Sequence, residues 1–565
     1  MQTSWALKNP SVSPRPDFPG ELAAALKISP LLAGLLIRRG IASLSDAKTF
    51  LFPSLADLQD PFLLPGVDEA VKLIRTHLAA GSKILIHGDY DVDGVTASAV
   101  LWQTLRKLGA DPFVFLPHRV SDGYGFTRSG VNAVQKNGAK LLITVDCGIS
   151  AAGPIGSVSA SGVDVIIVDH HQIPAEGVPQ SSVIVHPLMK ESGKTFRELS
   201  AVGLTFKLAQ ALLGEAAYEF LDLTALGTVA DLAPLKGENR ILVKYGLRKL
   251  SEKGTLGLRA LMSGAKLRGK VNAGHLGFVL GPRINASGRM DSADCAFKLL
   301  ISDSLKEAED LAKILEEENR LRQRIERKVC EEAVEKVERE VNFKRDRVMV
   351  VWGKHWHQGV LGIVASRLVE KFYRPAVVIS FEGEGPGKGS ARSIPKFNVF
   401  SALEKTAEFL VEFGGHEQAA GLRIEENQLE AFRKAVNEEA SVMLDPACLV
   451  KAYQVDFEVE TLGALSMPFA RELDLFEPFG LGNPKPLFLT RNLSIKGQPV
   501  YSGKDRLKFW AEDGTATLEA SWYRPRFVPG EDLRRIDLIY TLNSKTIVGE
   551  EFPYLEVKDL RVSGM

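Results

Sequence analysis

The chain has 565 residues, of which 45% are hydrophobic and 25% are charged, and its formal net charge is zero. At about 150 residues per domain this predicts three or four globular domains, and the balanced charge neither favours nor excludes nucleic acid as a partner. The four cysteines form no Cys-x-x-Cys pair, and neither a signal peptide nor a run of about eighteen apolar residues is present, which argues against a zinc cluster, a disulfide scaffold or a membrane span and favours the cytoplasm.

Residues 1–70 read as a small, mostly helical preface. Its four prolines, Pro10, Pro14, Pro16 and Pro19, predict an extended start.

Residues 71–300 are expected to form an α/β domain. Short apolar runs alternate with helical patterns up to about residue 185, and residues 200–300 read as mainly helical. This alternation predicts a mostly parallel sheet covered on both faces, with sites beyond the carboxyl ends of its strands. The expected strands are 83–87, 113–116, 141–145, 163–168 and 183–185, and the expected helices are 95–108, 129–137 and 151–160.

A charged stretch over residues 301–345 predicts one long helix that links two domains. Its apolar residues recur every four positions from Leu321 to Val341, so the stripe drifts by about 40° per step round a helix of 3.6 residues per turn. A coiled coil is the alternative, but no heptad is kept. A second α/β domain is expected over residues 346–448. Short strands between Gly, Pro and Asp turns predict a C-terminal β-barrel over residues 449–565.

Three carboxylates, Asp89, Asp91 and Asp93, alternate directly after the first expected strand. Alternation in an extended segment places them on one side, where like charges are unfavourable unless a cation neutralises them. An acidic turn or a Ca²⁺ loop is the alternative, but the EF-hand pattern fails because no Glu stands at the twelfth loop position.

Further polar residues follow later strands of the same sheet. Asp146 follows the strand at 141–145, the run Asp169-His170-His171 follows the next strand, and Asp231 follows an apolar run at 221–230. Taken alone, Asp146 could be a helix cap or turn residue and Asp231 an ordinary helix-end charge. A lone histidine is usually structural, but two consecutive histidines after an aspartate at a strand end favour a site. Together, successive strands of one sheet deliver them to one edge. Carboxylates mixed with imidazoles suit Mn²⁺ or Mg²⁺, and a bridging carboxylate could hold two ions ~3.5–4 Å apart for in-line attack on phosphorus.

These motifs resemble those of the DHH phosphoesterase superfamily, and residues 20–565 resemble its bacterial RecJ family of single-strand-specific DNA exonucleases. The resemblance implies a DHH domain, a DHH-associated domain and an OB-fold. It also implies a 5′→3′ exonuclease that releases mononucleotides in recombination and repair, with a helicase and a single-strand-binding protein as partners; we expect a monomer. The metal ligands that it implies are Asp91, Asp93, Asp146, His170 and Asp231, with His87 and Asp89 as further candidates.

The resemblance also implies catalytic roles for three residues. His171 would contact the scissile phosphate and protonate the leaving oxygen, Asp169 would orient a neighbour, and Arg119, in the loop from Pro117 to Gly125, would stabilise charge on phosphate. Without the resemblance, this stretch is only a polar loop.

Candidate phosphate ligands lie in three further motifs. The segment 281–289 offers Arg283, Asn285 and Arg289, with a turn carrying surface arginines as the alternative. Residues 387–393 do not match a Walker loop and resemble the DHH-associated domain instead, where Ser390 and Arg392 would hold backbone phosphate. In the Gly-Gly-His signature at 414–416, Gly415 permits close approach, His416 is a candidate ligand, and amides of a helix expected to follow would favour an anion.

The terminal barrel could bind a single strand by aromatic stacking. The candidate aromatics are Tyr501, Phe509, Trp510, Trp522 and Tyr523, although most could equally be core residues. Two other functions remain open from the sequence: a small-substrate phosphodiesterase that cleaves oligoribonucleotides or cyclic dinucleotides, and an inactive single-strand-binding scaffold. The length and the barrel favour a polymeric substrate, and the intact set of candidate ligands argues against the scaffold.

Overall fold

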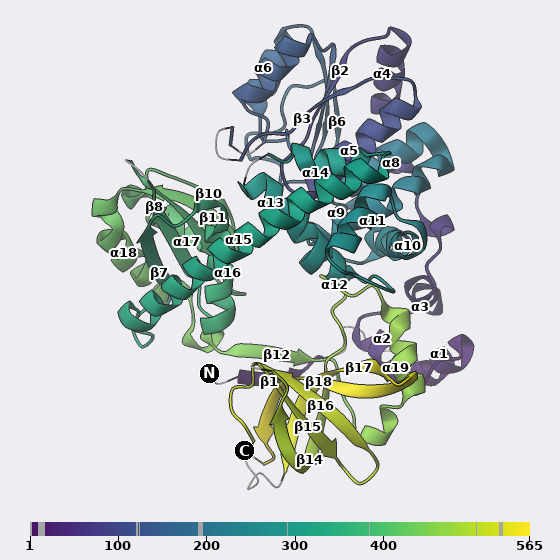
Figure 1. The fold of residues 1–565 in the computed structure, drawn as a ribbon, viewed down its shortest axis with the longest axis vertical. Helices are drawn as coiled ribbons and strands as arrows, with labels where there is room; N and C mark the ends of the chain where they lie inside the picture. The colour runs from purple at the N-terminus through teal and green to yellow at the C-terminus, as the bar shows by residue number, and fades with distance from the viewer. Residues whose placement is uncertain are drawn as a thin grey trace. The chain divides into compact units, whose positions relative to one another are not determined.

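The structure is a computed structural model that describes residues 3–9, 17–119, 122–123, 125–189, 196–290, 292–382, 385–503, 505–529 and 535–564. Pro10, Pro14 and Pro16, for which an extended start is predicted, lie outside the described residues. The chain divides into two compact units, drawn in Figure 1. The first unit contains residues 1–4, 118–121 and 282–452, and the second unit contains residues 5–117, 122–281 and 453–565.

The N-terminal segment begins with a strand and continues as helices. Its elements are β1 (Thr3–Leu7), α1 (Phe18–Leu26), α2 (Pro30–Arg38), α3 (Leu44–Leu51) and α4 (Val67–Ala79). Pro19 does not extend the chain as predicted, because it stands in the first turn of α1, where a missing backbone N–H is tolerated. Among the described residues no single helix is long and apolar enough to cross a membrane, and only the bent pair α1–α2 meets that test together.

A five-stranded parallel sheet positions the polar motifs in the second unit. Its order is β3-β2-β4-β5-β6, with β2 (Ile84–His87), β3 (Phe113–Phe115), β4 (Leu141–Val145), β5 (Asp164–Val168) and β6 (Val183–Val185). Helices α6 (Arg128–Asn137) and α7 (Ala152–Ala160) share a buried apolar core with β2, β4 and β5. Helix α5 (Val92–Lys107) contacts β2 and β4. The predicted parallel sheet is therefore confirmed, and β2, β4 and β5 are adjacent in it.

A helical layer follows the sheet in the second unit. Its helices are α8 (Ala201–Leu213), α9 (Leu221–Ala230), α10 (Gly237–Lys253), α11 (Leu256–Gly264) and α12 (Ala273–His275). Helix α8 packs against α5 and α9, and it also contacts β4 and β5. Helix α9 ends directly before Asp231, so this packing carries a residue from outside the sheet toward the strand ends.

The C-terminal part of the second unit is a β-barrel, as predicted. Its sheet runs β13-β14-β15-β16-β18-β17, and an additional antiparallel pairing of β14 with β17 closes it. The strands are β13 (Phe457–Glu458), β14 (Phe488–Tyr501), β15 (Arg506–Glu512), β16 (Thr517–Tyr523), β17 (Ile536–Ile547) and β18 (Glu550–Val562). Apolar side chains of α1, α2, α3 and α19 (Met467–Leu473) share the core of the barrel. A separate strand, β12 (Lys451–Val455), pairs with β1.

One buried arginine ties the helical layer to the barrel side of the second unit. The guanidinium of Arg240, in α10, donates hydrogen bonds of 2.9 Å to the carbonyl oxygens of Phe50, Leu475 and Phe476. It also lies 4.0 Å from the centre of the Phe50 ring. Burial lowers the pKa of Arg240 to about 10, which leaves the guanidinium charged at neutral pH.

The first unit contains the long helix and the second sheet. Its helices are α13 (Gly281–Met290), α14 (Asp294–Ile301), α15 (Leu305–Glu340), α16 (Leu361–Phe372), α17 (Val399–Lys405) and α18 (Leu429–Met443). The predicted long helix is α15, and the C-terminal half of its stripe, from Val329 to Val337, is buried against α16 and β7. The turn considered for residues 281–289 is wrong, because these residues are helical.

The sheet of the first unit is mixed. Its order is β10-β11-β9-β8-β7, and only β7 and β8 run parallel. The strands are β7 (Met349–Lys354), β8 (Ala376–Phe381), β9 (Gly387–Arg392), β10 (Glu412–His416) and β11 (Ala419–Ile424). The prediction that a helix follows the Gly-Gly-His signature is wrong: the signature ends β10, and residues 412–424 form a β-hairpin.

Candidate metal centre

The acidic motif lies where β2 gives way to α5. Asp91 is the N-cap of α5, and its Oδ1 atom accepts a hydrogen bond of 3.1 Å from the amide of Gly94. Asp89 and Asp93 flank it and are both buried. The turn from strand to helix therefore gathers three carboxylates at the carboxyl end of β2, where water cannot screen their mutual repulsion.

Asp146 follows β4 in a strained conformation. Its backbone φ is +63°, in the left-handed region that residues other than glycine rarely adopt, while its amide still donates a 3.0 Å hydrogen bond to the carbonyl of Val168. Such conformations persist only where the surrounding structure enforces them, and they cluster at functional sites. Here the strained turn at the end of β4 presents a buried carboxylate beside the end of β5.

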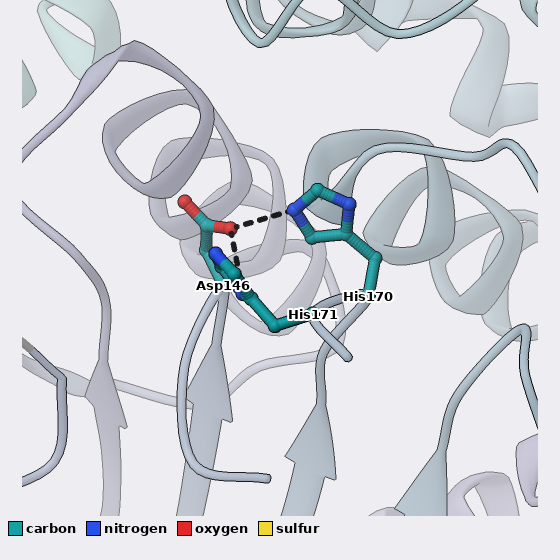
Figure 2. Close-up of side chains that lie close together, drawn as sticks. All are labelled: Asp146, His170 and His171. Atoms are coloured by element: carbon teal, nitrogen blue, oxygen red, sulfur yellow. Dashed lines mark ion pairs between the residues drawn. The ribbon is translucent and has the colours of Figure 1, made fainter. Parts of the chain in front are cut away.

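The carboxylates and imidazoles meet at this edge of the sheet (Figure 2). The Oδ1 atom of Asp146 lies 3.2 Å from Nε2 of His170 and 4.0 Å from Nδ1 of His171. His170 also lies between two further acids, with Nε2 3.9 Å from Oδ2 of Asp93 and Nδ1 3.8 Å from Oδ2 of Asp231. Side chains that are far apart in the sequence thus converge within a few ångströms.

Three overlapping groups of side chains could each hold a metal ion. In each group the ligand atoms lie within 4.8 Å of one another; Asp146 belongs to two of the groups, and His170 also belongs to two. The groups are Asp89–Asp91–Asp146, Asp146–His170–His171 and Asp93–His170–Asp231. Six of the seven predicted metal ligands belong to these groups; the exception is His87.

The electrostatics of the cluster fit a cation. Burial, followed by the charge of Asp91, raises the pKa of Asp93 to about 7, and burial followed by the charge of Asp93 raises the pKa of Asp231 to about 9. Burial together with four neighbouring aspartates raises the pKa of Asp146 well above its usual value. Burial and the charge of His171 lower the pKa of His170 to about 4, so this imidazole is neutral and its nitrogen lone pair is available to a metal.

Asp169 belongs to none of the three metal groups, and its carboxylate binds the two histidines that follow it and the amide of Ile149. Its Oδ1 atom accepts hydrogen bonds from the amides of His170 and His171 and lies 2.8 Å from Nδ1 of His171, while Oδ2 accepts the amide of Ile149 at 3.0 Å. Burial disfavours the charged imidazole of His171, but the bond to Asp169 outweighs it and raises the pKa of His171. These bonds hold the imidazole of His171 against Asp169.

His87 lies outside the three groups, although it was a candidate ligand. It is fully buried, its ring centre lies 5.3 Å from that of Phe115 and 4.9 Å from that of Phe126, and its Nδ1 is 3.5 Å from Sγ of Cys147. Burial lowers the pKa of His87 to about 4.

Three residues that were not predicted from the sequence form hydrogen bonds with members of the cluster. The Nε2 atom of His186, which follows β6, lies 2.9 Å from the carbonyl oxygen of His171. The rule that pointed to Asp146, a polar residue at the end of a parallel strand, also applies to His186. The carboxylate of Asp93 accepts the amides of Ala201 and Val202 at 2.7 and 2.9 Å, and no pattern in the sequence signals these backbone contacts.

The predicted phosphate ligands belong to the first unit, and so does Arg119. The Nη1 atom of Arg392 donates to Oγ of Ser390 at 3.0 Å. Burial, and then the charge of Arg119, lowers the pKa of Arg392, so two guanidinium groups share this part of the first unit. In α13, Arg283 donates to Oε2 of Glu316 at 2.7 Å, and Arg289 donates to the carbonyl of Gly359 at 3.1 Å. Asn285 lies on the same helix and is partly buried.

The Gly-Gly-His signature has a local structural cause in the first unit. Gly415 has a φ of +141°, and a Cβ atom there would lie 2.5 Å from the carbonyl oxygen of Ala419 across the hairpin. Only glycine therefore fits this position without moving β11. His416 is exposed at the end of β10, where its Nδ1 accepts a hydrogen bond from the amide of Gln418.

The barrel divides the aromatic candidates into two sets. Phe509 and Trp522 are buried in the core of the barrel, so they cannot stack on a nucleic acid base. Tyr501, Trp510 and Tyr523 are each about half exposed and remain candidates for stacking.

Comparisons with known proteins agree with this architecture. Three family descriptions match the chain: "DHH family, N-terminal domain" over residues 83–228, "DHHA1 domain" over residues 345–441 and "RecJ OB domain" over residues 455–559. Among solved structures, RecJ of Thermus thermophilus in complex with Mn²⁺ superimposes with a TM-score of 0.84 at 30% identity, covering 99% of this chain and 80% of that one.

Curated relatives match over most of the chain. The single-stranded-DNA-specific exonuclease RecJ of Bacillus subtilis (strain 168) is 37% identical over 569 aligned residues, which cover 99% of this chain and 71% of the relative. The protein of the same description from Escherichia coli (strain K12) is 34% identical and covers 92% of this chain and 96% of the relative. The chain therefore belongs to the RecJ family of the DHH phosphoesterases.

Proposed function

We propose that this chain is an exonuclease specific for single-stranded DNA, which it degrades from 5′ to 3′ into 5′-mononucleotides with two divalent ions, Mn²⁺ or Mg²⁺. The observation that carries the proposal is the convergence of Asp146, His170 and their neighbours into overlapping groups with the spacing of metal ligands. Relatives of this chain are named single-stranded-DNA-specific exonucleases, and a related structure contains Mn²⁺. Bound ions polarise phosphoryl oxygens and lower the pKa of water.

The ligands proposed for the ions are Asp89, Asp91, Asp93, Asp146, His170 and Asp231. The buried carboxylates with raised pKa values support this assignment, since they are stable as anions only beside a cation. His87 is a weaker candidate because aromatic rings and Cys147 surround it.

His171 is proposed as the general acid that protonates the leaving oxygen. Its bond to Asp169 directs Nδ1 inward, which leaves Nε2 to exchange a proton with the substrate. The raised pKa of His171 keeps the imidazole protonated closer to neutral pH, as a general acid requires.

Phosphate groups of the strand are proposed to bind in the first unit, to Arg119, Ser390 and Arg392, with Arg283, Asn285, Arg289, Gly415 and His416 as further contacts. The shared positive charge of Arg119 and Arg392 supports this assignment, because an anion relieves their repulsion. A role for Arg119 in stabilising charge on the reacting phosphate stays part of the proposal.

The substrate class can be tested by comparing the digestion rates of four substrates. Purified protein with Mn²⁺ is given a long single-stranded DNA, the same sequence as a blunt duplex, a dinucleotide and a cyclic dinucleotide. Rapid digestion of the single strand, with the other three substrates at least about ten times slower, supports the proposal. Faster cleavage of the dinucleotide or of the cyclic dinucleotide would identify a small-substrate phosphodiesterase. Binding of the single strand without any cleavage would identify an inactive scaffold.

The cellular setting is also proposed. The four cysteines, all within the described residues, form no disulfide, which suits the reducing cytoplasm. We place the chain there as a monomer that acts in recombination and repair with a helicase and a single-strand-binding protein. We also propose the domain boundaries 1–70, 71–300, 301–345, 346–448 and 449–565.

A further inference from the structure

Both oxygens of the Asp93 carboxylate are held by the first turn of another helix. Oδ2 accepts the amide of Ala201 at 2.7 Å, and Oδ1 accepts the amide of Val202 at 2.9 Å. These are the first two residues of α8, whose amides have no partner within the helix. The direction of Asp93 therefore depends on where the N-terminus of α8 lies.

Ser200 determines where α8 begins. It is the N-cap of the helix, it is fully buried, and its Oγ atom accepts a hydrogen bond from the amide of Gly203. The same Oγ atom lies 3.2 Å from Oγ1 of Thr228 in α9, which is also fully buried. One hydroxyl pair thus joins the start of α8 to the last turn of α9.

The last turn of α9 carries the other acid of the same candidate metal group. Asp231 directly follows α9, and its amide donates to the carbonyl of Gly227 at 2.9 Å. Gly227 packs so closely that a Cβ atom there would lie 2.3 Å from Oγ1 of Thr96 and 2.9 Å from Oδ1 of Asp93. The backbone of α9 at Gly227 therefore lies directly against the side chains of Asp93 and Thr96, four residues before Asp231.

We propose that the buried hydroxyl pair of Ser200 and Thr228 positions Asp93 and Asp231 relative to each other, and so sets the affinity of the Asp93–His170–Asp231 group for a divalent cation. The pair acts as a brace: Ser200 caps the helix whose first two amides bind Asp93, and Thr228 lies in the turn that leads to Asp231. Neither hydroxyl is a ligand in any of the three metal groups. The inference rests on the proposed function, since it assumes that the group binds a metal.

The test measures Mn²⁺ binding to the full chain without DNA, by electron paramagnetic resonance of the free ion. Ser200→Ala and Thr228→Val each remove one hydroxyl of the pair. Loss of a residue that supports metal ligands weakens binding by about 10–100-fold, and we expect each variant to lie near the lower end of that range. The double variant should bind about as weakly as Ser200→Ala, because Ser200→Ala already breaks the contact that Thr228→Val removes.

Matched controls separate positioning from general packing. Thr224→Val removes a fully buried hydroxyl one turn earlier in α9, where it donates to the carbonyl of Phe220 in its own helix. Ser29→Ala removes an equivalent N-cap hydroxyl from α2. Both controls should keep the Mn²⁺ affinity of the unchanged chain. Thr228→Ser and Ser200→Thr retain a hydroxyl and should restore most of the lost affinity.

The outcomes distinguish this inference from the proposed function. Three results together support the brace. Mn²⁺ binds more weakly to Ser200→Ala and Thr228→Val, and the conservative variants restore the affinity. The metal-free deletion variants unfold at the same temperature as metal-free Thr224→Val. Unchanged Mn²⁺ affinity in both deletions, or an equal loss in Thr224→Val, overturns the brace alone. An unchanged chain that binds no Mn²⁺ overturns both the brace and the proposed function.

Discussion

The Nδ1 atom of His171 lies 2.8 Å from Oδ1 of Asp169, and the same oxygen accepts the amides of His170 and His171. One carboxylate thus fixes the backbone turn that presents both histidines and also the ring orientation of the second one. Asp169 is almost fully buried, whereas the side chain of His171 is partly exposed, so the carboxylate provides the fixed end of this bond.

Replacing Asp169 should impair catalysis through His171. In Asp169→Asn the carboxylate charge is lost, so the pKa of His171 should fall and the protonated imidazole should persist only at lower pH. We expect about a 10–100-fold drop in kcat at neutral pH, and an alkaline limb of the pH–rate profile displaced toward lower pH. Stopped digestion of labelled single strands at a series of pH values on both sides of neutrality measures both effects.

The matched control is Asp164→Asn in β5. Asp164 also pairs with a histidine, with Oδ2 3.0 Å from Nε2 of His77, but away from the cluster. Its pH–rate profile should coincide with that of the unchanged chain. An Asp169→Asn profile that keeps its alkaline limb would contradict the role given to Asp169.

Metal should stabilise the protein more strongly as the pH rises. Without metal, burial and neighbouring charges raise the pKa of Asp93 to about 7 and that of Asp231 to about 9, against about 3.9 in an unfolded chain. A raised carboxyl pKa contributes stability at low pH that is lost as the pH passes through the folded value. Bound Mn²⁺ replaces these protons, so the gap in Tm between Mn²⁺ and EDTA should widen from about pH 6 to about pH 9.

Scanning calorimetry at several pH values measures that gap. Binding of Mn²⁺ should also release protons at neutral pH, which titration calorimetry in two buffers of different ionisation enthalpy detects. A gap that narrows with rising pH would show that these carboxylates are not the groups displaced by metal.

The buried Arg240 should be essential for stability. In Arg240→Lys the charge remains, but one ammonium group cannot reach the three carbonyls of Phe50, Leu475 and Phe476. A hydrogen bond to a charged group contributes about 1.5–3 kcal/mol, so we expect a loss of at least that size in the free energy of unfolding. Urea unfolding measures it. Arg248→Lys in the same helix is the control, because Arg248 is exposed and its pair with Glu252 is on the surface. Equal stability losses in the two variants would refute the assignment.

Strand binding by the barrel should depend on Trp510 and not on its neighbour Phe509. Trp510→Ala should weaken binding of single-stranded DNA by about 1–3 kcal/mol with little change in stability, because a half-exposed ring can stack on a base. Phe509→Ala should instead destabilise the barrel by about 3–5 kcal/mol, since Phe509 is buried in its core. Fluorescence anisotropy and thermal unfolding separate the two effects. Unchanged DNA affinity in Trp510→Ala would exclude this ring as a stacking platform.

The position of the metal cluster could be predicted because parallel strands share one carboxyl edge. Asp146 follows β4 and His170 follows β5, and these neighbouring strands bring them to 3.2 Å. The same rule could not decide whether His87 joins the metal groups. The side chain of a residue at a strand end can pack against a neighbouring helix as readily as it can face the site. His87 contacts Phe126, which is remote from it in the sequence.

Three other features depended on tertiary packing. Phe509 and Trp510 are adjacent in a strand, so they must face opposite sides, but their sequence does not say which side is the core. The amides of Ala201 and Val202 bind Asp93 through the backbone, which any residue except proline can supply, so no side-chain pattern marks them. The prediction of a helix after the Gly-Gly-His signature was wrong because Gly415 allows two strands to approach each other closely.

The most direct test of the metal-dependent exonuclease is digestion of single-stranded oligonucleotides labelled at the 5′ or the 3′ end, with Mn²⁺, Mg²⁺ or EDTA. The unchanged chain should release labelled mononucleotides at once from the 5′ label and only at the end from the 3′ label, and EDTA should stop both. The digestion rate of Asp146→Asn should fall at least about 10³-fold. At about 1.36 kcal/mol per factor of ten, this raises the activation free energy by several kcal/mol. The variant should still bind the strand. Equal digestion in EDTA, or full activity of Asp146→Asn, would contradict the account.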